Sequence, residues 1–160
     1  MDPQQNRVNT TISVRPLLHR PGERKEVSLT LDAETASSFG LCCAQLPQVK
    51  GVLENRAGVL FFRYTAECVL DLVCDRCLSS VTYPVCEEFE HIVVTELAVE
   101  QNDSDYLLAS DAMLDVAEVV MTDLRLSLPS KTLCSEACLG LCPHCGQNRN
   151  EAPCSCCEEA

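Results

Sequence analysis

Cysteine makes up 13 of the 160 residues, and this count constrains the fold more than any other feature of the sequence. Such a thiol content is typical of a disulfide scaffold or of a set of metal sites. Residues 1–10 lack the basic and then apolar organisation of a signal peptide, and no later apolar run is long enough to span a membrane. We therefore expect a cytoplasmic, reducing location, where clustered thiols bind zinc more often than they form disulfides.

Eight cysteines fall into four pairs that have the spacing of metal ligands. The pairs are Cys74 and Cys77, Cys134 and Cys138, Cys142 and Cys145, and Cys154 and Cys156. A tetrahedral zinc ion takes four soft ligands, and a two-residue spacer lets both thiolates of a tight turn face one ion. Pro143 presets such a turn and Gly146 allows a positive φ after it, so residues 142–146 are the clearest knuckle in the chain.

The other thiols and the histidines have simpler interpretations. Cys157 is interpreted as a spare thiol, and His144 as a turn residue, because complete cysteine sets lie nearby. His91 is isolated, and a lone histidine is more often structural or solvated than a ligand. Free cysteine is among the most buried residue types, so the cysteines without ligand spacing are interpreted as core or surface thiols with no role. These are Cys42, Cys43, Cys68 and Cys86.

The spacing of Cys74 and Cys77 also serves thioredoxin-like redox chemistry, in which the first cysteine opens a helix after a strand. Here strand-like residues lie on both sides of the pair. This context favours a turn between two strands, and therefore zinc ligation over redox chemistry.

The region between residues 8 and 97 predicts mostly β-structure. β-branched and aromatic residues predict a long antiparallel hairpin over residues 49–54 and 59–73, with a turn at 55–58. Residues 33–43 are interpreted as a short helix or a loop. Shorter strands are expected over residues 8–18 and 27–31, with a turn at 19–24 between them. Two more are expected over residues 78–83 and 89–97, with an interruption at Pro84.

One main helix is predicted after a polar loop at residues 100–105. Asp111 has the side chain of an N-cap, apolar residues recur at helical spacing from Leu114 to Leu128, and Pro129 ends the pattern. Acidic residues, among them Asp123, are expected on the solvated face. The elements together predict an α+β fold, in which an antiparallel β-sheet is packed by one main helix.

The composition changes after residue 131, and the change predicts two parts of the chain. We expect an α+β domain over residues 1–130, with a central zinc knuckle at 74–77, and a cysteine-rich zinc-binding tail over residues 131–160. The tail has too little apolar material to fold without a cross-link.

Charge and motif content narrow the function classes. The chain has 12 Lys and Arg against 24 Asp and Glu, a net charge of -12, which favours a basic partner over bare RNA. A basic cluster of Arg15, Arg20, Arg24 and Lys25 is either a solvated turn or an RNA contact. The sequence has no G-x-S-x-G, P-loop, dinucleotide-binding or H-E-x-x-H motif. We therefore expect neither enzymatic activity nor a small-molecule substrate.

Two sets of residues resemble the YceD family, the bacterial and plastid large ribosomal RNA subunit accumulation proteins. They are C-D-R-C-L at 74–78 and the segment 134–156, with its G-L-C-P-H-C-G motif followed by Gln147, Asn148, Asn150 and C-S-C. The resemblance implies a non-enzymatic role in accumulation of the large-subunit (23S) ribosomal RNA, hence in ribosome biogenesis. It also implies a large-subunit ribosomal precursor or a basic ribosomal protein as partner. Family members often continue with a basic segment, whereas this sequence reads Glu-Glu-Ala at 158–160, so no RNA contact of that kind is expected.

The resemblance further implies which cysteines share an ion. Some relatives look to lack the second knuckle while keeping the central pair and a Cys or His pair after the helix, which would make these two pairs one site. One structural Zn²⁺ would then be held by Cys74, Cys77, Cys134 and Cys138, and a second by Cys142, Cys145, Cys154 and Cys156. The competing assignment is a single Zn²⁺ held by Cys134, Cys138, Cys142 and Cys145.

Two other function classes stay open on the sequence. A thiol oxidoreductase or redox sensor would use Cys74 and Cys77 or the terminal thiols, and would show a depressed thiol pKa and dithiol turnover. A zinc store or chaperone, suggested by the surplus thiols, would exchange its metal readily, whereas a structural site would exchange it slowly.

Overall fold

The main sheet is built on two long hairpins that share one strand. In the computed structural model, which describes residues 9–96 and 106–157, the strand order is β2-β3-β4-β5-β6. Neighbours are antiparallel except β5 and β6, which are parallel. In strand order, the bounds are Arg24–Thr30, Cys43–Arg56, Val59–Val73, Ser80–Val94 and Tyr106–Leu108.

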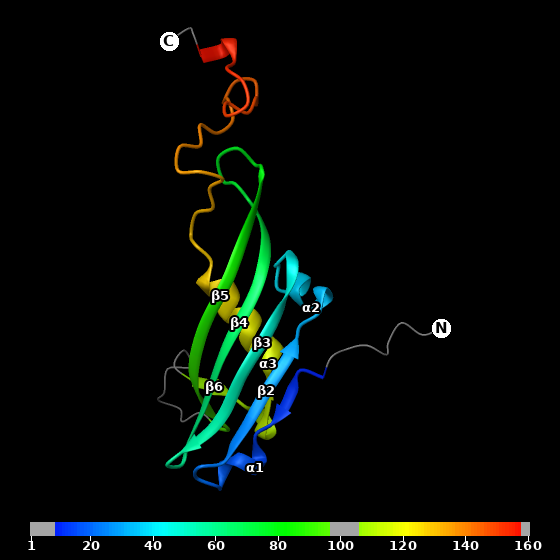
Figure 1. Ribbon diagram of the computed structural model, residues 1–160, viewed down its shortest axis with the longest axis vertical. Coiled ribbons are helices and arrows are strands. Elements are labelled where there is room, and N and C mark those ends of the chain that lie inside the picture. Colours follow the sequence, from blue (N-terminus) through cyan, green and yellow to red (C-terminus); the bar gives the residue numbers. More distant parts are fainter. Residues whose placement is uncertain (1–8, 97–105, 158–160) are drawn as a thin grey trace, which may run out of the picture.

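The helices α1, α2 and α3 lie around this sheet, and α3 crosses one of its faces (Figure 1). A separate two-stranded sheet is formed by β1 (Thr11–Ser13) and β7 (Met113–Asp115). The helices are α1 (Arg15–Leu18), α2 (Ala33–Ser38) and α3 (Val116–Ser127), with short 3-10 turns at Ser110–Ala112 and Ser155–Cys157. The predicted α+β class, with a mostly antiparallel sheet and one main helix, is confirmed.

The core lies between the inner face of the sheet and α3. Alternate residues of β4 point to this face, and among them Phe62, Tyr64 and Leu70 are fully buried. From the other side α3 contributes the apolar positions that the helical pattern predicts, including Val120 and Leu124, which are both 0% exposed. This core fixes the hairpin of β4 and β5, whose far end extends beyond α3 toward the tail (Figure 1).

The N-terminal strand prediction is wrong for most of residues 8–18. Only Thr11–Ser13 form a strand, and Arg15–Leu18 form the helix α1. Pro16 lies in the first turn of α1, where its missing N–H and fixed φ fit a helix start better than a strand interior. Val8 lies outside the described residues. Residues 33–43 resolve in favour of a short helix, because Asp32 caps α2 by accepting a hydrogen bond from the Thr35 N–H at 2.7 Å.

The interruption predicted at Pro84 is also wrong. β5 runs unbroken from Ser80 to Val94, and Pro84 faces Val69 of β4 within it. Among the described residues, β5 has a second neighbour only at Ile92–Val94, where β6 pairs with it. Pro84 therefore lies on an open edge of the sheet, where a residue without an N–H is tolerated.

The start of the main helix differs from the prediction, whereas its end does not. Asp111 adopts a φ of 54° in a 3-10 turn, and Leu114 belongs to β7, where it pairs with Ile12. The N-cap is Asp115, whose carboxylate accepts hydrogen bonds from the N–H groups of Ala117 and Glu118 at 3.0 and 3.3 Å. The helix ends at Ser127, two residues before Pro129. The loop predicted at residues 100–105 lies outside the described residues.

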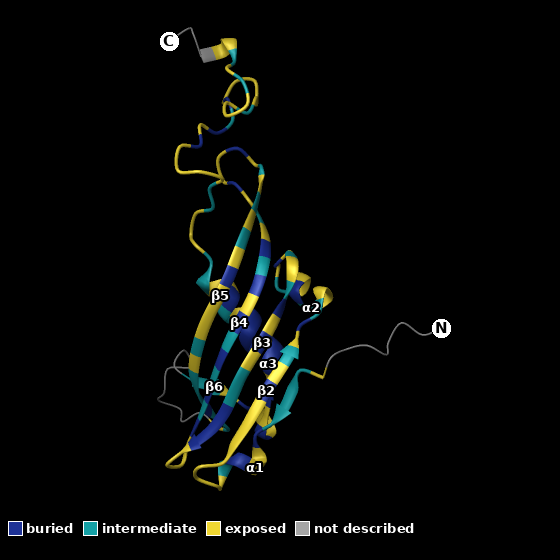
Figure 2. Ribbon diagram, in the orientation of Figure 1, coloured by how far each residue is buried: buried dark blue, intermediate teal, exposed yellow. Residues whose placement is uncertain are grey.

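A second, smaller buried cluster occupies the far end of the β4–β5 hairpin. Its buried members are Cys74, Cys77 and Cys138, and the partly buried Val81, Leu133 and Leu141 pack against them. Along the tail itself buried residues are few, as Figure 2 shows by the predominance of exposed positions. Sulfur atoms therefore form the interior of this end of the molecule. No described helix is long and apolar enough to cross a membrane.

Candidate metal centres

Four cysteine sulfurs meet where the tail crosses the end of the β4–β5 hairpin. We call this group the hairpin centre; it consists of Cys74, Cys77, Cys134 and Cys138. All four Sγ atoms lie within 4.8 Å of one another. The Sγ atoms of Cys74 and Cys138 are 3.8 Å apart, and those of Cys77 and Cys134 are 3.6 Å apart.

These separations fit a tetrahedral metal ion. Four thiolates at the usual zinc–sulfur distance of about 2.3 Å lie about 3.8 Å apart along the edges of a tetrahedron. A disulfide would need sulfur atoms about 2.05 Å apart, which none of the described cysteines forms. The donor set and its spacing are therefore those of a site that could hold a metal ion.

The first two sulfurs of the hairpin centre come from a tight turn between β4 and β5. The turn is closed by the Leu78 N–H, which donates to the Cys74 carbonyl at 2.9 Å. Burial opposes ionisation of the Cys74 thiol, but three backbone groups hydrogen bond to its sulfur and lower its pKa to about 6. These groups belong to Cys134, Cys77 and Arg76. The turn thus presents a thiolate, which is the form that binds metal.

The other two sulfurs belong to the tail, and hydrogen bonds to the hairpin turn hold this segment in place. Asp75 bonds to Thr132 twice: its N–H donates to the Thr132 carbonyl at 2.8 Å, and its carboxylate accepts from the Thr132 N–H at 2.7 Å. The Arg76 guanidinium donates to the Cys138 carbonyl at 2.9 Å, and the Arg76 carbonyl accepts from the Leu141 N–H at 3.0 Å. Residues 74–77 therefore bind the tail on both sides of its two cysteines.

Proton sharing among these thiols follows from the same contacts. Hydrogen bonds to Cys138 and Cys77 hold the proton on Cys134 and raise its pKa to about 11. Burial opposes ionisation of Cys138, yet the Asn150 side chain and the Gly140 backbone N–H lower its pKa. The four sulfurs therefore form a network of donor thiols and acceptor thiolates, and a bound metal ion would displace the remaining protons.

A second group of four sulfurs lies entirely within the tail. We call it the tail centre; it consists of Cys142, Cys145, Cys154 and Cys156, and its Sγ atoms also lie within 4.8 Å of one another. Backbone N–H groups of Cys145 and His144 donate to the Cys142 sulfur and lower its pKa to about 6. The turn closes through the Gly146 N–H, which donates to the Cys142 carbonyl at 2.9 Å. Gly146 has a φ of 74°, as the knuckle pattern predicts.

The structure groups the cysteines as the family resemblance implies. Cys134 and Cys138 lie with the hairpin turn, and Cys142 and Cys145 lie with Cys154 and Cys156, so the competing set of Cys134, Cys138, Cys142 and Cys145 is not formed. The turn of Cys74 and Cys77 lies between two strands, not at the start of a helix. The four cysteines without ligand spacing lie outside both groups, with Cys68 buried, Cys43 half-buried, and Cys42 and Cys86 exposed.

Asn150 is a site residue that the spacing of the cysteines does not reveal. Its amide nitrogen donates to the Cys138 sulfur at 3.3 Å, and its amide oxygen accepts from the Leu139 N–H at 2.8 Å. The signal available in the sequence is the pair Asn148 and Asn150, since asparagine side chains form such turns. Asn148 holds Asn150 by accepting from its backbone N–H at 3.1 Å and its side-chain amide at 2.8 Å.

A partly buried polar contact in the core corrects the interpretation of Asp123 and agrees with that of His91. Asp123 is not on a solvated face, since its side chain is only 13% exposed and accepts a hydrogen bond from the Tyr64 hydroxyl. His91 has the structural role that its isolation in the sequence favours, because its Nε2 lies 2.5 Å from the Asp123 carboxylate. Burial, and then the bond to Asp123, raise the pKa of Tyr64. These groups fasten α3 to β4 and β5.

Two residues of the basic cluster near the N-terminus, Arg15 and Arg24, have partners within the protein. Arg24 pairs with Glu54, with 2.6 Å between guanidinium nitrogen and carboxylate oxygen. Arg15 reaches the Asp111 carbonyl at 3.5 Å. These two contacts favour the interpretation of the cluster as a surface turn over that of an RNA contact.

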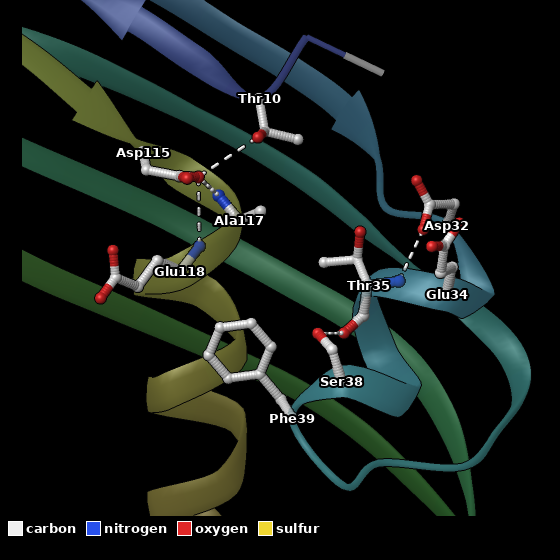
Figure 3. Close-up of a pocket in the computed structure, with 9 residues that line it drawn as sticks. All are labelled: Thr10, Asp32, Glu34, Thr35, Ser38, Phe39, Asp115, Ala117 and Glu118. Atoms are coloured by element: carbon white, nitrogen blue, oxygen red, sulfur yellow. Dashed lines mark hydrogen bonds between the residues drawn. The ribbon is translucent and has the colours of Figure 1, made fainter. Parts of the chain in front are cut away.

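A cavity of about 350 Å³ lies between α2 and the start of α3, and acidic side chains surround it (Figure 3). Asp32 and Asp115 among them are the N-caps of the two helices. Figure 3 shows their carboxylates turned to backbone N–H groups of the helices. Capping therefore explains their presence.

Comparison with known proteins agrees with the sequence motifs. The model of a family described as large ribosomal RNA subunit accumulation protein YceD matches residues 62–160, which is more than half of the chain and includes both centres. No curated protein and no solved structure matches the chain.

Proposed function

The chain belongs to the YceD family of large ribosomal RNA subunit accumulation proteins, and from this we propose its function. We propose that it is a non-enzymatic, zinc-dependent factor that supports accumulation of the large-subunit (23S) ribosomal RNA. The family name implies a role in ribosomal RNA accumulation. The proposal adds that each centre holds one structural Zn²⁺ and that the zinc-folded end of the molecule serves this role.

The observation that carries the proposal is the convergence of two complete four-thiolate sets. Catalytic zinc sites keep a coordination position open for water or substrate and usually use His or carboxylate ligands, whereas structural sites are closed by four protein ligands. Each centre offers four cysteines. This arrangement supports a structural role over hydrolysis.

Zinc at the hairpin centre would supply a redox-inert cross-link between distant segments. The residues that it joins are already aligned by the hydrogen bonds of Asp75 and Arg76 to the tail. The tail has few other means of support, since its buried residues are mostly cysteines. Its shape as a binding surface therefore depends on the thiolates.

Charge supports a basic partner, either a basic ribosomal protein or a large-subunit precursor that exposes one. The chain carries a net charge of -12 before metal binding. A zinc ion with four thiolates adds a net charge of −2 at each centre. Direct contact with bare RNA is therefore disfavoured, because phosphate binding depends on cationic surfaces.

The test is complementation in cells that lack the endogenous copy. We expect the wild-type chain to restore the ratio of large-subunit to small-subunit ribosomal RNA, and Cys142→Ser with Cys145→Ser to fail because the tail centre is lost. Cys86→Ser is the matched control, since Cys86 is an exposed thiol outside both centres and should restore the ratio. Full complementation by the double variant would contradict the proposal, as would an unchanged ratio in cells that lack the protein.

A purification from the same cells separates the proposal from the redox alternative. Large-subunit precursors or basic ribosomal proteins should copurify with the wild-type chain at moderate salt and be lost with the double variant. Recovery of thiol redox partners in their place would favour a thiol oxidoreductase.

A further inference from the structure

One loop of the tail centre reaches the hairpin centre and contacts one of its cysteines. Residues 146–153 lie between Cys145 and Cys154, which both belong to the tail centre. Asn150, within this loop, donates its side-chain N–H to the Cys138 sulfur of the hairpin centre at 3.3 Å. A residue positioned by one centre therefore hydrogen bonds to a ligand of the other.

We propose that Asn150 is a positioning residue of the hairpin centre and that it couples metal loading of the two centres. The inference rests on the proposed function in one respect, namely that both centres hold Zn²⁺. It goes beyond that proposal by assigning a role to a residue that is not a ligand and by predicting that the two ions bind cooperatively.

The first step is the effect of Asn150 on the hairpin centre. A four-thiolate site with Zn²⁺ has excess negative charge on sulfur, and N–H donors to the sulfurs offset this charge and orient the ligands. Asn150 provides such a donor to Cys138, and it also accepts from the Leu139 N–H at 2.8 Å. It thereby fixes both the sulfur and the backbone that follows it.

The second step is the dependence of Asn150 on the tail centre. Within the tail, the loop is held by the Arg149 N–H bond to the Gly140 carbonyl at 2.9 Å and by the bridge between Leu141 and Asn148. Arg149 is exposed and Leu141 and Asn148 are half-buried, whereas Gly140 is buried, so water competes for part of these bonds. A metal ion at the tail centre would close the loop at both ends and so reduce the entropy lost when Asn150 docks.

Coupling of this kind acts in both directions. If Zn²⁺ at the tail centre raises the affinity of the hairpin centre by some factor, then Zn²⁺ at the hairpin centre raises the affinity of the tail centre by the same factor. The singly loaded forms would therefore be less populated than they are for two sites that bind without coupling.

The experiment measures Zn²⁺ affinity at each centre of the full chain. Zn²⁺ is titrated against a chelator, and cysteine alkylation with peptide mapping reports which thiols are released at each chelator concentration. Asn150→Ala should weaken Zn²⁺ at the hairpin centre about tenfold, which is the usual cost of losing a hydrogen bond to a ligand. Removing the tail centre with Cys154→Ser and Cys156→Ser should weaken it by a similar factor.

The decisive result comes from combining these changes. In the Asn150→Ala chain, removal of the tail centre should cause little further loss at the hairpin centre, because the connecting contact is already absent. The inference would be overturned if removal of the tail centre weakened Zn²⁺ binding at the hairpin centre as much in the Asn150→Ala chain as in the wild type. An Asn150→Ala chain with wild-type affinity at the hairpin centre would overturn it too. The control is Gln147→Ala, which removes another exposed amide side chain from the same loop and should leave both affinities unchanged.

A second variant separates hydrogen bonding to sulfur from a role in the turn. Asn150→Asp keeps the oxygen that accepts from Leu139 but replaces the donor to Cys138 with a carboxylate. It should weaken the hairpin centre at least as much as Asn150→Ala does, and should shift the thiolate-to-metal absorption band of the Co²⁺-loaded centre. An Asn150→Asp chain with wild-type affinity would contradict the sulfur contact. Zinc missing from both centres of the wild-type chain would overturn the proposed function as well, whereas two ions that bind independently would overturn this inference alone.

Discussion

The hairpin centre and the tail centre share one backbone turn but differ in what they connect. In both, the residue after the second cysteine donates its N–H to the carbonyl of the first at 2.9 Å, from Leu78 in one and Gly146 in the other. In both, backbone groups lower the pKa of the first thiol to about 6. The hairpin centre joins cysteines separated by 57 and 64 residues, whereas the ligands of the tail centre all lie between Cys142 and Cys156.

This difference shows that one motif can serve two purposes. The hairpin centre places the tail relative to the sheet, so it determines tertiary structure. The tail centre folds a short segment upon itself, so it determines local structure. The sheet and α3 have an apolar core of their own, whose buried residues form a separate cluster from the buried cysteines, so we expect them to fold without either centre.

Metal removal should have the largest effect and should separate these regions. Structural zinc contributes on the order of 10 kcal/mol to folding of small zinc fingers, so chelation should unfold the tail. Hydrogen exchange should rise across residues 131–157 on chelation, while exchange in β3 and β4 stays slow. Equal exposure of the sheet would contradict the independence of the two regions.

A core substitution should have the opposite pattern. Leu124 is fully buried against the sheet, and Leu124→Ala should cost about 2–5 kcal/mol through lost burial and a cavity. Urea unfolding of the sheet domain should show this loss equally in the zinc-loaded and the chelated protein. The exposed Leu126, at 77% exposure on the same helix, is the matched control, and Leu126→Ala should change stability little. A loss of stability that differs between the zinc-loaded and the chelated protein would show that the sheet and the zinc-binding tail do not fold separately.

The depressed thiol pKa values predict a pH dependence for the metal-free knuckle turns. Cys74 and Cys142 have their pKa lowered from 9.0 to about 6. A group with a depressed pKa in the folded state stabilises that state fully above the unfolded pKa, and this contribution is lost as the pH falls through the folded pKa. The metal-free turns should therefore be most ordered above about pH 9 and least ordered below about pH 6.

Thiolate absorbance near 240 nm measures this titration. The metal-free wild-type chain should gain absorbance around pH 6, and Cys74→Ser and Cys142→Ser should each remove part of that step. Cys86→Ser should retain it, because the pKa of Cys86 is raised by burial and by Glu67. A wild-type chain that ionises only near pH 9 would contradict the role of the backbone N–H groups.

The smallest predicted effect concerns the last residue of each knuckle. Leu78 has a φ of 60° and Gly146 has a φ of 74°, a region that costs residues with a Cβ about 1–2 kcal/mol. Gly146→Ala should therefore weaken Zn²⁺ at the tail centre several-fold. Leu78→Gly should strengthen the hairpin centre slightly, since the side chain is 65% exposed and glycine's greater freedom in the unfolded chain offsets part of the gain. Competition with a chelator measures both, and a gain from Gly146→Ala would contradict the shared turn.

The parts of the structure that follow short-range rules were predictable from the sequence. Residues 59–73 are rich in β-branched and aromatic side chains, and their burial alternates as in a half-buried strand. The knuckle at 142–146 contains its own turn residues. Errors arose where tertiary contacts outweigh local preference. Leu114 joins β7 because Ile12 pairs with it, and Pro84 remains in β5 because that edge lacks a second neighbour among the described residues.

The candidate site was predictable in its ligands but not in its supporting contacts. Cysteine spacing identifies pairs, and the resemblance to a family suggested how the pairs combine. The bonds of Arg76 to Cys138 and of Asn150 to the same residue cross 62 and 12 residues of sequence. No local pattern specifies such bonds, because they depend on where the folded tail meets the hairpin.

Native mass spectrometry of the zinc-loaded chain tests most directly the central claim that the chain has two separate four-cysteine sites. The account predicts two Zn²⁺ per wild-type chain, one after Cys74→Ser with Cys138→Ser, and one after Cys142→Ser with Cys145→Ser. Cys42→Ser with Cys43→Ser should retain two, because these cysteines lie outside both centres. A single Zn²⁺ in the wild type that survives loss of Cys74 would contradict the account.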